Sequence, residues 1–129
     1  MPTAEKIEDL IIWKKARKIT RELYSVSKIC GSARDFALRD QLRQSSISIS
    51  SNIAEGFERG SNKEFIQYLF IAEGSAGEAR TQLYIALDQN YITAEIFARL
   101  NENLITISRQ ISSLNQYLKH SDLKGAKHL

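Results

Sequence analysis

The sequence SNKEFIQYLFIAEGSAGEARTQLYIALDQN, residues 61–90, carries the clearest helical pattern of the chain. It opens with Ser61 and Glu64 in the spacing of a capping box, in which each side chain can bind a free backbone N–H group at the start of a helix. Apolar residues then recur at alternating intervals of four and three, which is typical of a helix that packs along one seam. This seam consists of Phe65, Leu69, Ala72, Ala76, Ala79, Leu83 and Ala86. We therefore expect a helix over about residues 62–89, with an alanine-rich seam that a neighbouring helix can approach closely.

A helix is also expected over about residues 10–30. Asp9 can cap its start, and Gly31 suits the left-handed residue that often follows a helix. The apolar positions recur on one side of this helix, as a partly buried helix requires. They are Ile12, Trp13, Ala16, Ile19, Leu23 and Val26.

The two remaining helices are expected at about residues 36–55 and 94–119. The first of them is rich in serine, a mediocre helix former, so tertiary packing must stabilise it, and Gly56 is expected to end it. Thr93 can cap the last helix. The apolar stripe of the last helix consists of Ile96, Leu100, Leu104, Ile107, Ile111, Leu114 and Leu118, and a polar tail follows over residues 120–129.

The connections between these segments are short, which makes consecutive helices antiparallel neighbours. With 129 residues, of which 43% are hydrophobic and 26% charged, the chain has the size and composition of one globular domain. We predict a single all-α domain over residues 1–129, an antiparallel up-and-down four-helix bundle.

The composition also bears on location. Cys30 is the one cysteine, so an internal disulfide is impossible and a reducing cytoplasm fits. No apolar run approaches the roughly 20 residues that a membrane span needs. Residues 1–9 are polar and carry three acids, unlike a signal peptide. A cytoplasmic protein without a membrane partner is expected.

Catalytic and metal-binding patterns are missing from the sequence. The histidines are His120 and His128, both in the tail, and neither has a Glu three residues before it, as a di-iron bundle requires. Glu73 and Glu78 are five residues apart and do not share a helix face. There is no P-loop, dinucleotide fingerprint or HExxH motif. We therefore expect no catalytic residue, metal or cofactor, and we interpret the chain as a non-enzyme.

Basic side chains form a stripe on the helix expected at residues 10–30. Residues 1–31 hold seven basic and four acidic side chains, in a chain whose net charge is +3. The stripe is a candidate surface for nucleic-acid phosphates, and the alternative is an ordinary solvated helix face. It consists of Lys14, Arg17, Lys18, Arg21 and Lys28.

Two arginines of the next helix, Arg39 and Arg43, are further candidates for phosphate contacts, since the planar guanidinium group suits phosphate and carboxylate partners. The alternative for these arginines, and for Arg59 just beyond that helix, is pairing with nearby acids. Those acids are Asp40, Glu55 and Glu58.

Two matching sets of polar residues occur on consecutive helices. Both sets have spacings of about four and three residues, and each lies next to an apolar stripe. They are Ser48, Asn52 and Glu55, followed by Ser75, Glu78 and Gln82. Buried polar groups need partners, so hydrogen bonds between helices or between subunits are favoured over a ligand site.

Several short motifs occur together over the second and third expected helices. They are Gln41-Leu42-Arg43, Ser48-Ile49, Asn52-Ile53-Ala54-Glu55-Gly56, Arg59, Phe65, Ile71-Ala72, Gly74-Ser75, Glu78 and Thr81-Gln82-Leu83. With these motifs the chain resembles the four helix bundle protein family, also called the 23S ribosomal-RNA intervening-sequence protein family. The resemblance covers about residues 10–118, and the run from Asn52 to Gly56 is its most specific part.

The resemblance implies an up-and-down bundle that assembles as a homopentamer, often encoded within large-subunit ribosomal RNA genes, with no enzymatic activity. The family is also similar to the accessory variability determinant of diversity-generating retroelements, which implies RNA or DNA and a reverse transcriptase as partners. Our hypothesis is a pentameric protein that binds nucleic acid. The alternative is a structural or adaptor oligomer that binds a protein partner without nucleic acid.

Overall fold

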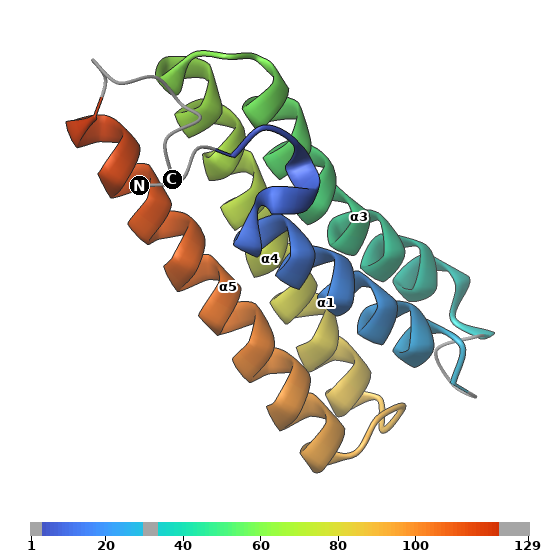
Figure 1. Cartoon of the computed structure of the whole chain (residues 1–129). Coiled ribbons are helices and arrows are strands. Elements are labelled where there is room, and N and C mark those ends of the chain that lie inside the picture. Colours follow the sequence, from blue (N-terminus) through green and yellow to red (C-terminus); the bar gives the residue numbers. More distant parts are fainter. Residues whose placement is uncertain (1–3, 30–33, 122–129) are drawn as a thin grey trace.

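The computed structural model describes residues 4–29 and 34–121, and within these ranges the chain forms four long α-helices and one short 3-10 helix. The 3-10 helix η1 covers Ile7–Asp9. The α-helices are α1 (Ile11–Ser27), α3 (Phe36–Glu58), α4 (Asn62–Asp88) and α5 (Ala94–His120). Consecutive helices run in opposite directions (Figure 1). The predicted all-α, antiparallel four-helix bundle is therefore confirmed.

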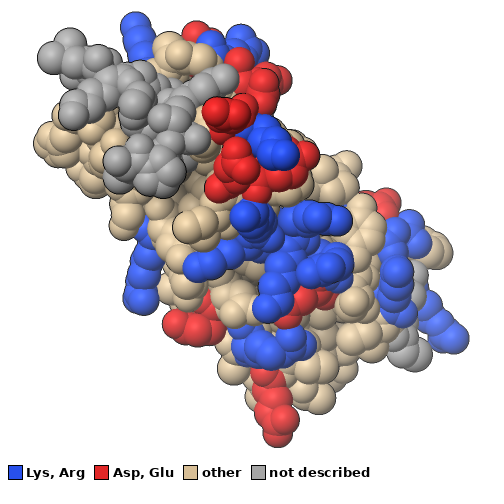
Figure 2. All heavy atoms as spheres, in the orientation of Figure 1, with Lys and Arg blue, Asp and Glu red and all other residues tan. Residues whose placement is uncertain are grey.

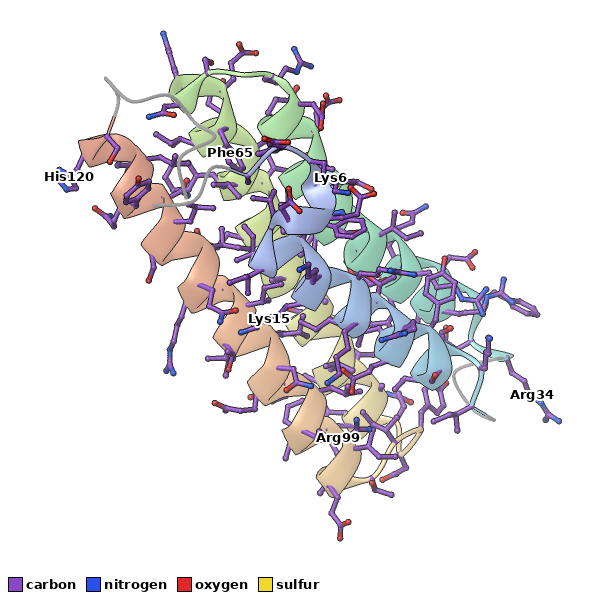
Figure 3. The ribbon with its side chains drawn as sticks, viewed as in Figure 1. Lys6, Lys15, Arg34, Phe65, Arg99 and His120 are labelled. Carbon is purple, nitrogen blue, oxygen red and sulfur yellow. The ribbon has the colours of Figure 1, made fainter. Side chains whose placement is uncertain are left out.

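Each helix packs against two neighbours. α1 lies between α3 and α5, and α4 also contacts both α3 and α5, so that α1 and α4 occupy opposite corners (Figure 1). The predicted seam of α4 is fully buried, and Phe65 points into the interior of the bundle (Figure 3). Because four of its seven seam residues are alanines, α3 and α5 approach the α4 backbone closely.

The ends of α4 and α5 follow local capping chemistry. The Ser61 hydroxyl accepts the Glu64 N–H at 3.3 Å, and Thr93 accepts the Ile96 N–H at 3.2 Å. α4 ends before Asn90, which adopts the left-handed conformation with a φ of 61°, while the Tyr91 N–H donates to the Ala86 carbonyl at 2.9 Å.

The predicted start of the first helix is wrong in detail. Asp9 does not cap α1, because its carboxylate accepts the N–H groups of Glu5 and Lys6 at 3.2 and 3.3 Å and so stabilises η1 instead. Leu10 occupies the N-cap position without a side-chain hydrogen bond. α1 ends at Ser27, while the predicted end at Cys30 and its expected cap Gly31 lie outside the described residues.

Gly56 does not end the second helix, contrary to the prediction. α3 continues to Glu58, and the glycine with a positive φ, 83°, is Gly60. Gly56 is buried where α3 meets α4, and a Cβ atom added there would lie 2.7 Å from the Cβ of Tyr68. The absence of a side chain at this position therefore allows the two helices to pack together.

Asp35 starts α3 and ties it to the distant end of α4. Its carboxylate accepts the Leu38 N–H at 3.1 Å and the Tyr91 hydroxyl at 3.1 Å. The bond to Asp35 raises the pKa of the Tyr91 phenol above its usual value. Asp35 thus serves as a helix cap and as a contact between the α3 start and the α4–α5 connection.

Candidate nucleic-acid interface

Four of the five cations predicted on the first helix lie on the exposed face of α1, and the fifth, Lys28, is its exposed C-cap residue. Because successive residues of a helix turn by about 100°, these positions form one strip along the helix axis. Figure 2 shows the Lys and Arg atoms gathered over the middle of α1. Within residues 4–29 and 34–121, no ion pair engages any of the five. We call Lys14, Arg17, Lys18, Arg21 and Lys28 the basic face.

Lys15 extends the basic face toward α5, a position that the sequence pattern did not single out. It is exposed and lies on the α5 side of α1 (Figure 3), where a groove of about 210 Å³ is lined by Lys15, Lys18 and Glu22 together with residues of α5. Glu22 is already paired, because its carboxylate accepts a hydrogen bond from Arg99 at 2.6 Å. The negative charge of Glu22 is therefore balanced by Arg99 of α5 and not by the lysines beside it.

The arginines of α3 are placed differently from those of α1. Arg39 pairs with Asp40 at 3.0 Å and its guanidinium lies over the Phe36 ring. Arg43 is half-buried, donates from Nε to the Ser27 hydroxyl at 2.8 Å and covers the Tyr24 ring at 5.0 Å. Both arginines contact groups of the same chain, but only Arg39 has an acidic partner there.

Arg59, just beyond α3, follows the alternative of acid pairing. It lies 3.4 Å from the carboxylate of Glu55 and 3.5 Å from that of Glu64. It also donates to the Tyr68 hydroxyl at 2.7 Å. Its charge is therefore shared between two acids on the outside of the α3–α4 turn.

A cleft of about 450 Å³ lies between α1 and α3, beside the basic face. Thr20 joins the two helices at its floor, since its hydroxyl donates to the Ser46 carbonyl at 3.1 Å. The cleft stays open because α3 contributes only the small Ser50 side chain to its wall. Its lining residues are Trp13, Arg17, Thr20, Arg21, Tyr24, Ser25, Lys28 and Ser50.

Trp13 and Tyr24 are the members of this cleft that sequence reasoning missed as site residues. The prediction places Trp13 in the apolar stripe, and it does pack partly against the core, but it is only half-buried and also lines the cleft. Trp13, Thr20 and Tyr24 are spaced seven and four residues apart, so they share one helix face between the buried stripe and the basic face. That spacing was a signal available in the sequence.

The match to a known family spans these elements. A profile described as "23S rRNA-intervening sequence protein" matches residues 8–113. The chain belongs to this family. The match includes the basic face, the α1–α3 cleft and all of α3 and α4. The predicted family resemblance is confirmed.

A solved structure supports the fold of this 23S rRNA-intervening sequence protein. It is a crystal structure of a protein with unknown function from the S23 ribosomal protein family of Bacteroides thetaiotaomicron, with 24% sequence identity and a TM-score of 0.74. The similarity covers 81% of this chain and 98% of that chain. At this identity the likeness shows the fold alone. No match was found among curated proteins.

Between α3 and α4 of this family member, serine hydroxyls form the hydrogen bonds. Ser48 and Ser75 lie 2.7 Å apart, and the Asn52 amide donates to the Ser48 hydroxyl at 2.9 Å. Gln82 accepts a hydrogen bond at 2.6 Å from Ser45, a residue outside the predicted polar sets. The Ser48–Ser75 and Ser45–Gln82 bonds connect two helices of the same chain, whereas the Asn52–Ser48 bond lies within α3.

Two members of the polar sets predicted from the sequence, Glu55 and Glu78, take no part in these hydrogen bonds. Both are exposed, and Glu55 pairs with Arg59. Glu78 lies in a groove of about 480 Å³ on the outer side of α3 and α4, between Gln41 and Ile85. The structure therefore divides these polar sets into buried or half-buried hydroxyl and amide groups and exposed carboxylates.

Large apolar side chains are also exposed on α3 and α4, and two of them lie toward α5, where Tyr84 packs against Phe97 and Phe70 lies under Lys119. α3 contributes Ile47, and α4 contributes four more whose exposed fractions lie between 43% and 51%. Gly74 and Gly77 lie among them, and a Cβ atom added at either glycine would meet no neighbour within 4 Å. The four from α4 are Phe70, Ile71, Tyr84 and Ile85.

Membrane-spanning helices and metal-binding clusters are absent from the described part of the chain. In residues 4–29 and 34–121, no helix is long and apolar enough to cross a membrane. Over the same ranges, no three His, Cys, Asp or Glu residues are grouped as a metal site would need. His120 is exposed at the end of α5 (Figure 3), whereas Cys30 and His128 lie outside the described residues.

Proposed function

We propose that this protein is a non-enzymatic, self-associating bundle that binds nucleic acid in the cytoplasm through the basic face of α1. The observation that carries the proposal is the set of five exposed cations along α1 and at its C-cap, none of which is neutralised by an ion pair in the described part of the chain. Phosphates are the natural counter-charge for such a strip, because binding them releases condensed counterions from the nucleic acid.

The contrast with the other arginines supports this choice. Arg39 and Arg59 have acidic partners within the bundle, so their charge stabilises the fold. A basic helix face kept without acidic partners has no comparable structural use, and its mutual repulsion destabilises the free protein slightly. Binding an anionic polymer relieves that repulsion.

Self-association is proposed to occur on the outer side of α3 and α4, with a homopentamer as the assembly. Exposed apolar side chains of α4, among them Ile85 in the groove beside α3, offer an interaction surface. Five copies of a chain with net charge +3 would carry about +15 and contact phosphates repeatedly, so that weak single contacts add up. The basic face lies on α1, at the opposite corner from α4, and is not covered by this contact.

A second candidate function uses the same apolar groove. If the groove receives a different protein, such as a reverse transcriptase, the chain acts as an adaptor and the basic face is solvated. The groove of about 480 Å³ beside Ile85 is the observation that favours this alternative. Co-purification distinguishes the two, because the adaptor predicts one stoichiometric partner protein and an absorbance spectrum free of nucleic acid. Both candidates are oligomers, so a single chain in light scattering would count against both.

Charge reversal tests the nucleic-acid proposal. The triple variant Lys14→Glu, Lys18→Glu and Arg21→Glu is compared with a control that reverses three exposed cations elsewhere, Lys63→Glu, Arg109→Glu and Lys119→Glu. Both variants change the net charge equally. Binding of labelled RNA and DNA is followed by fluorescence anisotropy from low to high salt.

The α1 variant is expected to lose at least about 100-fold in affinity at low salt, and the slope of log affinity against log salt is expected to shrink by about 3. The control is expected to lose much less. Equal losses in both variants would show that only bulk charge matters, and an absence of binding by the unaltered protein would contradict the proposal.

A further inference from the structure

The α1–α3 cleft combines two kinds of side chain that the basic face by itself does not offer. Arg17, Arg21 and Lys28 bring three of the five cations of the basic face into its wall, while Trp13 and Tyr24 add two aromatic rings. A surface that binds only phosphates needs no aromatic ring. Positive charge beside aromatic side chains is the combination that proteins use to bind unpaired bases and their phosphates together.

From this arrangement we infer that the cleft binds single-stranded nucleic acid, with unpaired bases stacked on Trp13 and Tyr24 and the phosphates held by Arg17, Arg21 and Lys28. The inference rests on the proposed function and names its substrate class. A duplex keeps the faces of its bases stacked on one another, so it can reach the cations of the basic face but not the rings.

The dimensions of the cleft suit a short strand. Trp13 and Tyr24 are eleven residues apart on one helix face, which places them about 16 Å apart along α1. A single strand whose bases leave the stack to contact the rings spans this distance with a few nucleotides. The wall on the α3 side is low at Ser50, which leaves room of about 450 Å³ in the cleft for the bases.

Arg43 has a positioning role in this arrangement. Its guanidinium covers one face of the Tyr24 ring at 5.0 Å, and its Nε is fixed by a hydrogen bond to the Ser27 hydroxyl at 2.8 Å. Tyr24 is thus held between α1 and α3 while it still lines the cleft. This explains why Arg43, unlike the basic face, is half-buried and engaged within the chain.

The first experiment uses Trp13 as the probe, because it is the one tryptophan of the chain. The unaltered protein is titrated with oligothymidylate and oligouridylate of about 12 nucleotides, within the range of known single-strand site sizes. A duplex with the same number of phosphates is titrated in parallel. Both single strands are expected to quench the Trp13 emission, and the duplex is expected to bind by anisotropy while leaving the emission unchanged.

The second experiment removes the Tyr24 ring without changing the net charge. Tyr24→Leu is expected to weaken single-strand binding by about tenfold and to leave duplex binding unchanged. The matched control is Tyr68→Leu, since Tyr68 is also half-buried and also lies under an arginine, Arg59, at 5.1 Å. This control is expected to change neither affinity.

Trp13 packs partly against the core, so its replacement can also loosen the bundle. Ser50→Met therefore provides an independent variant, because it fills the cleft from α3 without altering either ring. It is expected to weaken single-strand binding by several-fold, with duplex binding and the thermal unfolding midpoint retained.

The outcomes separate this inference from the proposed function. Single strands and duplex can both bind without quenching the Trp13 emission, and Tyr24→Leu and Ser50→Met can bind them as tightly as the unaltered protein does. That result overturns the stacking inference and leaves the electrostatic proposal standing. If neither binds the unaltered protein, both are overturned. Quenching by single strands alone, with selective losses in the two cleft variants, supports both.

Discussion

α3 borders two grooves, and the two differ in the chemistry that they expose. Toward α1, Ser50 lines a cleft that contains aromatic rings and free cations, and the Ser46 carbonyl accepts a hydrogen bond from Thr20. Toward α4, Ser45 and Ser48 form hydrogen bonds with the facing helix, and the groove above them is apolar, with Ile85 in its wall. The small side chains of α3 leave room on both sides.

This comparison shows that the character of each groove comes from the helix that faces α3. α1 brings charge that has no partner in the described part of the chain, which suits a polyanion. α4 brings exposed apolar side chains, which suit another protein surface. One helix rich in small residues can therefore support a nucleic-acid surface and a self-association surface on its two flanks.

The largest expected effect is on assembly through the α4 flank. Ile71→Glu combined with Ile85→Glu would place carboxylates where we propose that a second copy packs, so we expect complete dissociation into single chains. Light scattering measures the mass. Ile11→Glu is the control, because Ile11 is equally apolar and more exposed but lies on α1, and it is expected to leave the mass unchanged. An unaltered mass in the double variant would refute the assignment of the α3–α4 side.

A second prediction compares two helical glycines, one inside the α3–α4 contact and one outside it. At Gly56 an added Cβ meets Tyr68 at 2.7 Å, so Gly56→Ala is expected to lower the free energy of unfolding by about 1–2 kcal/mol. At Gly74 nothing lies within 4 Å, so Gly74→Ala is expected to raise it by about 0.5–1 kcal/mol.

Urea unfolding of the dissociated Ile71→Glu, Ile85→Glu background measures both changes without a contribution from assembly. Equal effects at the two glycines would mean that α3 and α4 are not in close contact at Gly56.

A third prediction compares serines on the two flanks of α3. Ser45→Ala leaves the buried Gln82 oxygen without its partner and is expected to cost about 1–2 kcal/mol of folding free energy. Ser50→Ala removes a hydroxyl that bonds only within α3, to Ile47, and is expected to change stability by less than about 0.5 kcal/mol.

Adding Gln82→Leu to Ser45→Ala is expected to recover most of the loss, because no unpaired polar group then remains. Thermal and urea unfolding provide the measurement, and similar losses at Ser45 and Ser50 would contradict the distinction between the flanks.

The smallest expected effect concerns pH at the end of the α3–α4 groove. The Asp35 carboxylate raises the pKa of Tyr91, so the protonated phenol stabilises the folded state below the unfolded pKa of about 10. That contribution is lost as the pH rises through the folded pKa. The unfolding midpoint of the unaltered protein is therefore expected to fall more steeply above pH 10 than that of Tyr91→Phe. Parallel curves would show that the bond to Asp35 does not contribute.

Much of the fold could be predicted from the residues themselves. The seam from Phe65 to Ala86 predicted a buried helix face, and all of it is buried. Ser61 and Thr93 predicted helix starts, and both hydroxyls accept the expected N–H groups. Periodicity and capping act within one helix over a few residues, so a single stretch of sequence contains the whole signal.

The failures at Asp9 and Gly56 have a different origin. Each residue has a local preference that agrees with the prediction, but in the structure each makes a different contact that prevails over this preference. Asp9 closes η1 through the N–H groups of Glu5 and Lys6, and Gly56 removes a side chain where Tyr68 approaches. A local sequence pattern contains no information about a competing partner that lies outside the segment.

The sequence by itself determined four amphipathic helices, their antiparallel order and a strip of cations along α1. Only the tertiary structure decided that Arg43 covers Tyr24, that Ser45 meets Gln82, and that the cleft at Ser50 opens beside the basic face. The reason is physical. Helix formation depends on neighbours three and four residues away, whereas a groove exists only where side chains far apart in the chain are brought together and leave space between them.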